Sequence, residues 1–179
     1  MSALGANIEK VPADLLDQPL DYILTDHGRQ RTVMALLDQM MKGASNLQEI
    51  ADELVADISV EMKHHVQDEE EDLFPLLRRR CRPEDEIDTV LSRLSHEHKK
   101  SERLAILIVE QLRDCVDQGN PPWKSEELQT MVSEFTGAER LHLALENSVI
   151  LPLARARLTI GDLSLLSANM IARRAPTRC

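Results

Sequence analysis

The chain has 179 residues and a net charge of −10 at pH 7 with histidine counted as neutral. Apolar residues make up 42 %, charged residues 29 % and aromatic residues 2 %. This composition fits one globular domain and excludes a disordered chain. The scarcity of aromatic residues favours helices over β-structure, and the acidic balance argues against nucleic acid or anionic membranes as partners.

The first long helix is predicted over residues 19–43, because proline is tolerated in a first turn and glycine ends helices. A capping box of the form Ser-x-x-Gln at residues 45–48 then predicts the start of a second helix. Its apolar periodicity continues to about residue 80, with Pro75 as a kink or an early stop. These two segments are long enough to form an antiparallel helix pair.

The third helix is predicted to begin at Arg82, where a proline and acidic residues form the first turn, and to end at Gly119. Ser125 can cap a fourth helix, and Thr159 can cap a short fifth one. Four long helices on short connections predict an all-α, up-down-up-down four-helix bundle with a short C-terminal fifth helix. The expected organisation is a flexible leader at 1–17, the bundle at 18–157, and a short helix and tail at 158–179.

The expected compartment follows from the ends of the chain and its cysteines. The first ten residues lack the basic start and apolar stretch of a signal peptide, and no apolar run has transmembrane length. Cys81, Cys115 and Cys179 are widely spaced and form no CxxC pair, as expected of reduced thiols. We therefore expect a cytoplasmic protein with no membrane partner; the sequence does not indicate its oligomeric state.

One pattern of histidine, glutamate and proline occurs twice. His65, Glu69 and Pro75 recur 77 positions later with identical spacing. A single such group would be an ordinary polar helix face, whereas two copies in one register indicate a shared function. A shorter pattern, an acidic residue followed by histidine, also occurs twice, 71 positions apart. The residues of the second long copy are His142, Glu146 and Pro152, and the short pairs are Asp26-His27 and Glu97-His98.

The spacing has a chemical reading. Residues at i and i+4 lie on one helix face, so each His-x3-Glu pair presents one nitrogen and one carboxylate to the same point. His27 and His98 would each add an imidazole from the other two helices. The resulting nitrogen and oxygen shell suits iron, manganese or zinc, with two carboxylates shared between metals roughly 3.5–4 Å apart. Glu102, four residues after His98, is expected as an additional ligand.

Two other readings of the same helices remain open. Glu61 with His64, and Glu139 with His142, fit the Glu-x-x-His motif of ferritin-like di-iron bundles. Their offset is one residue out of step with the prolines, and this reading leaves three of the other histidines without a role. In the second alternative, the histidines satisfy one another in a structural bundle that holds zinc or no metal.

The two His-x3-Glu motifs, each followed by a proline, together with His27 and His98, resemble the hemerythrin-like family of HHE cation-binding domains over about residues 20–157. The resemblance implies a carboxylate-bridged, non-haem di-iron centre with two irons per chain. It implies that Glu69 and Glu146 are the bridges, with two histidines on each metal. The metal ligands expected from spacing and resemblance together are His27, His65, Glu69, His98, Glu102, His142 and Glu146.

The resemblance implies a protein that binds or senses oxygen, peroxide or nitric oxide, or that handles iron, with a small diatomic ligand or peroxide as its partner. Oxygen carriers of the family have a third histidine at the position of Glu102, so simple reversible oxygen carriage is not expected. The sequence contains no Gly-rich phosphate loop and no cofactor fingerprint. The alternatives are a di-iron oxidase, peroxidase or nitric oxide reductase-type enzyme, and a structural bundle with zinc.

Overall fold

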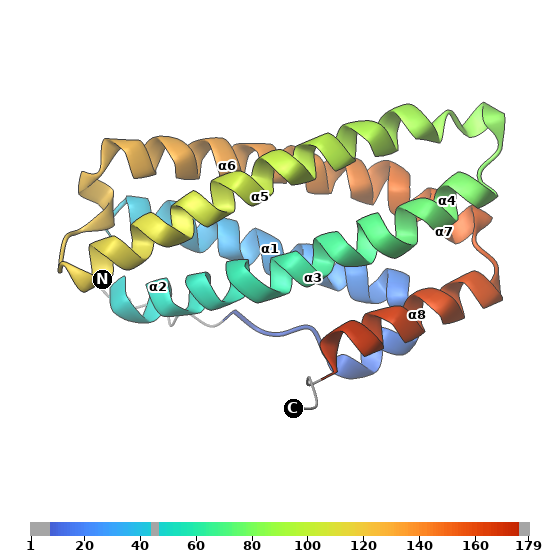
Figure 1. Cartoon of the computed structure of the whole chain (residues 1–179), viewed down its shortest axis with the longest axis horizontal. Helices are drawn as coiled ribbons and strands as arrows, with labels where there is room; N and C mark the ends of the chain where they lie inside the picture. The colour runs from blue at the N-terminus through green and yellow to red at the C-terminus, as the bar shows by residue number, and fades with distance from the viewer. Residues whose placement is uncertain (1–7, 44–46, 176–179) are drawn as a thin grey trace.

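The structure is a computed structural model that describes residues 8–43 and 47–175. All regular structure in these two ranges is helical, and the long helices run alternately up and down, which confirms the predicted all-α bundle (Figure 1). The expected capping box at 45–48 begins outside the described residues. Within the described ranges, no helix is both long and apolar enough to cross a lipid bilayer.

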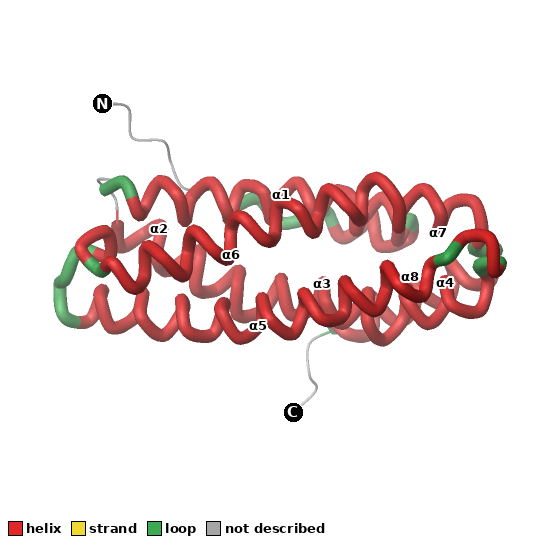
Figure 2. The backbone as a smooth tube through the Cα atoms, turned by 90° about the horizontal axis from the view of Figure 1, so that it is seen from above, coloured by secondary structure: helices red, strands yellow, loops and turns green. Residues whose placement is uncertain are grey.

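Four helical columns form the bundle, and Figure 2 shows them side by side along one long axis. Two of the columns are single helices, α1 (Pro19–Met41) and α5 (Ile87–Asp117). The other two are built from several helical segments that follow one another without a break. The second column consists of α2 (Leu47–Ala56), α3 (Met62–Gln67) and α4 (Phe74–Arg80), and the fourth of α6 (Glu126–Leu145) and α7 (Leu151–Arg157).

Wider π-helical turns join the segments of these two columns. They span Asp57–Glu61 and Asp68–Leu73 in the second column, and Glu146–Ile150 in the fourth. Pro75 and Pro152 are each the second residue of the α-helix that follows a π turn. Proline lacks an N–H group and its ring clashes with the carbonyl four residues earlier, and a π turn accommodates both effects. The helix therefore continues through Pro75, and the expected early stop does not occur.

Side-chain caps explain where the later helices begin. The hydroxyl of Ser125 accepts a hydrogen bond from the Leu128 N–H at 3.2 Å, and that of Thr159 accepts one from the Asp162 N–H at 3.2 Å. Both caps satisfy backbone groups that have no partner inside the helix. The predicted starts of the fourth helix and of the short fifth helix, α8 (Ile160–Arg174), are thus confirmed.

The start of the third helix differs from the prediction. Pro83–Asp85 forms a separate 3-10 turn, Glu86 has a positive φ of 46°, and α5 begins only at Ile87. The cause is the Asp85 side chain, which accepts a hydrogen bond from the Arg82 N–H at 2.8 Å and pairs with Arg157 at 2.7 Å. These contacts hold the turn against the end of α7, so the acidic residues do not join the helix.

Two apolar clusters fill the bundle, one toward each end. Phe74 and Leu91 belong to the cluster near α4 and α7, and Leu37 and Phe135 belong to the cluster near α2. Between the clusters, the columns turn polar and charged residues inward, and these side chains are buried. Burying ionisable groups is costly unless they are paired or hold a cation. The layer that divides the core is therefore the first place to look for function.

The segment expected as a flexible leader is in part ordered. Ala13–Asp17 forms a 3-10 turn, and Leu16 within it is buried in the apolar cluster near α4; residues 1–7 lie outside the described residues. Helix α8 packs beside this turn and beside the π turn Asp68–Leu73, as Figure 1 shows. Arg174 of α8 pairs with the buried Asp68 at 2.5 Å and donates a hydrogen bond to the hydroxyl of Tyr22 at 3.1 Å.

Candidate metal centre

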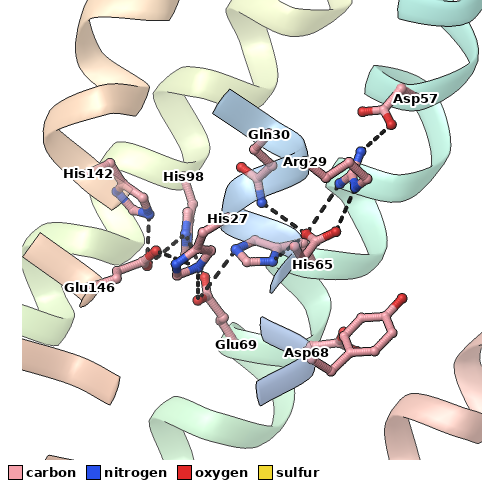
Figure 3. Close-up of polar contacts among 12 residues, drawn as sticks. His27, Arg29, Gln30, Asp57, His65, Asp68, Glu69, His98, His142 and Glu146 are labelled. Atoms are coloured by element: carbon pink, nitrogen blue, oxygen red, sulfur yellow. Dashed lines mark hydrogen bonds and ion pairs between the residues drawn. The ribbon is translucent and has the colours of Figure 1, made fainter. Parts of the chain in front are cut away.

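Four imidazoles and two carboxylates converge in the polar layer from all four columns (Figure 3). Each of the six side chains is at most 5 % exposed. They form two groups of possible metal ligands that share both glutamates. The first group is His27, His65, Glu69 and Glu146, and the second is Glu69, His98, His142 and Glu146.

The two glutamates each turn one oxygen toward each group. Glu69 Oε1 lies 3.5 Å from His65 Nε2, while its Oε2 lies 3.2 Å from His98 Nε2. Glu146 Oε2 lies 3.4 Å from His27 Nε2, while its Oε1 lies 2.9 Å from His142 Nε2. Donor atoms around one ion with bonds of about 2.1 Å are separated by about 3.0–3.4 Å. The donor separations thus match two neighbouring ions with both carboxylates between them.

The outer nitrogen of every imidazole in the cluster has a hydrogen-bond acceptor on a neighbouring column. His65 Nδ1 lies 2.9 Å from an Asp26 oxygen, and His142 Nδ1 lies 3.0 Å from a Glu97 oxygen. These acceptors assign the proton to Nδ1, so the lone pair of each neutral ring is on Nε2 and points inward. The remaining two pairs are His98 Nδ1 with Glu70 Oε1 at 2.6 Å and His27 Nδ1 with Asn147 Oδ1 at 2.8 Å.

The inward atoms are left without hydrogen-bond partners. All four carboxyl oxygens of Glu69 and Glu146, and the Nε2 atoms of His27, His65 and His98, are buried with no hydrogen bond of acceptable geometry. Native proteins rarely leave buried polar atoms unpaired, and each such atom calls for an explanation. A set of unpaired nitrogens and oxygens facing one point is explained by a cation there, and these donors suit iron, manganese or zinc.

A buried charged chain supports the first group from outside. Asp26 accepts hydrogen bonds from Arg29 at 2.6 Å and from Gln30 at 3.1 Å, in addition to its contact with His65. Arg29 also pairs with Asp57, and all three charged side chains are at most 6 % exposed. Burial opposes ionisation of Asp26, but the hydrogen bond and charge of His65, joined by Arg29, hold its pKa well below the usual range.

Without a metal, the cluster retains protons. Burial lowers the pKa of His27 to about 4, and the neighbouring charge of His65 acts in the same direction. Burial is the largest influence on His65 and His142 and disfavours their charge, but the neighbouring carboxylates together outweigh it and raise each pKa to about 9. For His65 these are Glu69, Asp26 and Glu146, and for His142 they are Glu146 and Glu69. Burial and the charge of Glu69 raise the pKa of Glu146 to about 7. Protons therefore offset the two buried carboxylates, and a metal ion would have to displace them.

Glu102 does not meet the expectation of a seventh ligand. It is exposed and belongs to neither group. A residue four positions after His98 lies about 40° around the helix from it, and on α5 this displacement leads toward solvent, whereas Ser101 and Ala105 face the interior. The i+4 rule identified a neighbouring position but not the centre of the buried face.

The ferritin-like alternative does not match the observed arrangement. Glu61 pairs with the exposed Lys10 at 3.5 Å, and His64 belongs to neither ligand group. Glu139 is buried, but its partner is the hydroxyl of Ser101.

The acidic run at residues 68–72 differs from what its sequence suggests. Five consecutive acidic residues are typical of a solvated helix face, but most of these side chains have partners in the structure. Asp68 and Asp72 pair with Arg173, and Glu70 binds His98.

The hydrogen-bond acceptors of the four imidazoles were not predicted from the sequence, although they lie within the same sequence repeats. Asp26 and Glu97, 71 positions apart, each bind the histidine of the following column. Glu70 and Asn147 are 77 positions apart, the offset of the main repeat, and bind the remaining two histidines. The twofold sequence pattern therefore includes the hydrogen-bond acceptors of the histidines. The acceptors of the two halves differ in charge only at one position, where the neutral Asn147 corresponds to Glu70.

Six side chains point inward and are buried between two apolar clusters, and an acceptor behind each of the four histidines orients its ring. They define a helical-bundle protein with a cation-binding layer. The family model for the hemerythrin HHE cation-binding domain matches residues 18–154, so the chain belongs to that family. No curated protein matches the chain.

Proposed function

We propose that this cytoplasmic protein binds two non-haem iron ions and uses them to bind or sense dioxygen, peroxide or nitric oxide. His27 and His65 would hold one ion, and His98 and His142 the other. Glu69 and Glu146 would bridge the pair. The observation that carries the proposal is the division of each glutamate's two oxygens between the two histidine groups.

The number of donors supports a site that accepts a further ligand. Each ion would receive two imidazoles and two shared carboxylate oxygens, which leaves open positions on an ion that takes up to six donors. When bound, iron would supply electrons and the open positions. The chain fixes the donor atoms through the Nδ1 hydrogen bonds and excludes water by the apolar clusters on both sides. A small neutral ligand that reaches such a site could bind at one of the open positions.

The test is metal content and its dependence on the bridges. The protein is expressed in iron-supplemented medium, purified without a metal-binding tag, and compared with a Glu69→Ala/Glu146→Ala double variant. We expect two irons per chain in the parent protein and a loss of both in the variant. The control is Glu84→Ala/Glu127→Ala, which removes two exposed glutamates away from the site and should retain both irons. One zinc per chain, retained in the bridge variant, would contradict the proposal and favour a structural bundle.

Gas reactivity separates the binding role from an enzymatic one. Stopped-flow mixing of the reduced protein with dioxygen, hydrogen peroxide or nitric oxide should give a fast spectral change with at least one of them. A second candidate, a di-iron oxidase, peroxidase or nitric oxide reductase-type enzyme, is favoured by the cavity that reaches the histidines. Repeated turnover with an added reductant would select the enzyme, and a single stoichiometric reaction would select binding or sensing.

A further inference from the structure

A cavity of about 500 Å³ lies between α5 and the column formed by residues 58–67, and it reaches His65, His98 and His142. A water molecule occupies roughly 30 Å³ of liquid, so a diatomic gas or peroxide would fill only a small part of this space. Cavities of about 300–1,000 Å³ commonly hold organic ligands. The volume therefore suits a much larger molecule than the small ligand of the metal site.

The cavity is elongated along α5. Its α5 lining recurs at helical spacing from His98, at the metal-ligand cluster, to Arg113 at the outer end. The part beyond the histidine, from Ser101 to Arg113, is roughly 18 Å long at 1.5 Å per residue. The middle section is apolar on both sides, with Ala105 and Val109 on α5 facing Ile58 and Met62. An extended hydrocarbon advances about 1.3 Å per bond, so the ten to twelve bonds of an alcohol with about ten to twelve carbons span about 13–16 Å between the end atoms. The van der Waals radii of those atoms add about 3 Å, which matches this length.

The inner end offers hydrogen-bond acceptors. Ser101 uses its hydroxyl to donate to Glu139, and both residues are buried. Glu139 and Gln30 also line the cavity, and Figure 3 shows Gln30 beside the histidine cluster. Their carboxyl and carbonyl oxygens have the capacity to accept a further hydrogen bond. A hydrogen-bond acceptor that faces a cavity favours a ligand that supplies a donor there. A hydroxyl group meets this requirement.

The exposed charges along the cavity favour a neutral molecule over an ion. Two cationic and two anionic side chains stand along the cavity, all exposed and none with an ion pair among the residues that the structure describes. The charges of these four balance one another, so they favour neither a carboxylate nor an ammonium ligand, and the buried carboxylate of Glu139 further disfavours an anion. The four are Lys63, Arg113, Glu102 and Glu110.

We propose that this cavity binds a neutral, unbranched amphiphile: an alkyl chain of about ten to twelve carbons that ends in a hydroxyl group. The chain lies between Met62 and Ala105, and the hydroxyl donates to Glu139 or Gln30 beside the metal-ligand histidines. The proposal goes beyond the di-iron function and does not depend on which metal is bound, because the walls and the acceptors belong to the polypeptide.

The test is calorimetric titration of the purified, metal-loaded protein with linear primary alcohols from 1-hexanol to 1-tetradecanol. Affinity should rise about fourfold for each added CH₂ group until the chain reaches ten to twelve carbons, and then level off. Replacing the hydroxyl of 1-decanol by a methyl ether removes the donor and should weaken binding about tenfold. No saturable binding, or binding that ignores chain length, would refute the proposal.

Variants locate the binding site. Ala105→Phe fills the middle of the cavity and should weaken 1-decanol binding at least tenfold, whereas Leu107→Phe, at an exposed position of the same helix outside the lining, should leave it unchanged. Thermal melts establish that both variants fold. Ile106→Trp replaces Ala105→Phe if that variant does not fold. Ile106 is half-exposed at the rim of the cavity, so a larger side chain there blocks the same space and disturbs the core less. Equal binding by folded cavity variants and the parent protein would overturn the proposal.

Discussion

The glutamate behind His98 gives the sharpest test of the metal centre. Glu70 accepts a hydrogen bond from His98 Nδ1 at 2.6 Å and another from Ser95 at 2.8 Å, whereas the equivalent position in the other half of the repeat is the neutral Asn147. Glu70→Gln keeps the shape and an acceptor but removes the charge, so it makes the two halves alike. The variant should bind the metal ion at His98 more weakly, because a carboxylate behind an imidazole makes that imidazole a more basic metal ligand.

The structure sets the size of this effect. Outer partners of metal-bound histidine are worth roughly 10–100-fold in affinity. The Glu70 side chain is 31 % exposed and also receives the Ser95 hydroxyl, so water and that bond weaken the effect of its charge. We therefore expect the lower end of the range, about tenfold, which is about 1.4 kcal/mol.

Competition with a coloured ferrous chelator under anaerobic conditions measures the change. Glu102→Gln is the matched control, since Glu102 is an exposed glutamate on α5 outside both ligand groups, and its affinity should equal that of the parent protein. An unchanged affinity in Glu70→Gln would refute the argument from the outer acceptors. A loss in Glu102→Gln instead would restore Glu102 as a ligand and require a different orientation of α5.

Two further predictions concern stability. The pKa values of His65 and His142 are raised to about 9 in the folded, metal-free protein from about 6.5 in the unfolded chain, so the stability they contribute is complete below about pH 6.5 and is lost as pH rises through about 9. The melting temperature of the metal-free protein should fall between pH 7 and 9.5, and that of the metal-loaded protein should fall less; a flat or rising metal-free curve would contradict this. Arg29→Met leaves the buried Asp57 without its cation and should cost about 3–5 kcal/mol in denaturant unfolding, whereas Arg140→Met, which breaks an exposed pair, should cost less than about 1 kcal/mol; equal losses would show that Arg29 is not buried as described.

The sequence predicted the fold and the inward ligands for one reason: both depend on short, regular spacing. Helical periodicity and the caps at Ser125 and Thr159 are local, and the structure confirms them. The repeat of His65 and Glu69 at a constant offset pointed to an inward face without any knowledge of the packing. The structure brings six of the seven expected ligands together.

What the sequence did not predict depends on contacts between columns. Spacing alone could not distinguish Glu102 from Ser101, because the centre of the buried face of α5 is decided by the helices that pack on it. The π turns are a response to Pro75 and Pro152 and have no periodicity of their own. Arg173 pairs with the acidic run across about a hundred residues of sequence, so the run reads as solvated when taken alone.

The two π turns that contain the shared glutamates constrain how this chain can change in length. A π turn holds one residue more than an α turn, and each residue gained or lost shifts the helix beyond it by about 100°. Glu69 and Glu146 lie within such turns, with Pro75 and Pro152 six positions further on. A deletion in one of these turns would rotate the helix beyond it, whereas the corresponding helix in the other half of the repeat would keep its orientation. We therefore expect a change of one residue in either turn to be disfavoured, because it would turn the apolar face of the helix beyond it away from the core.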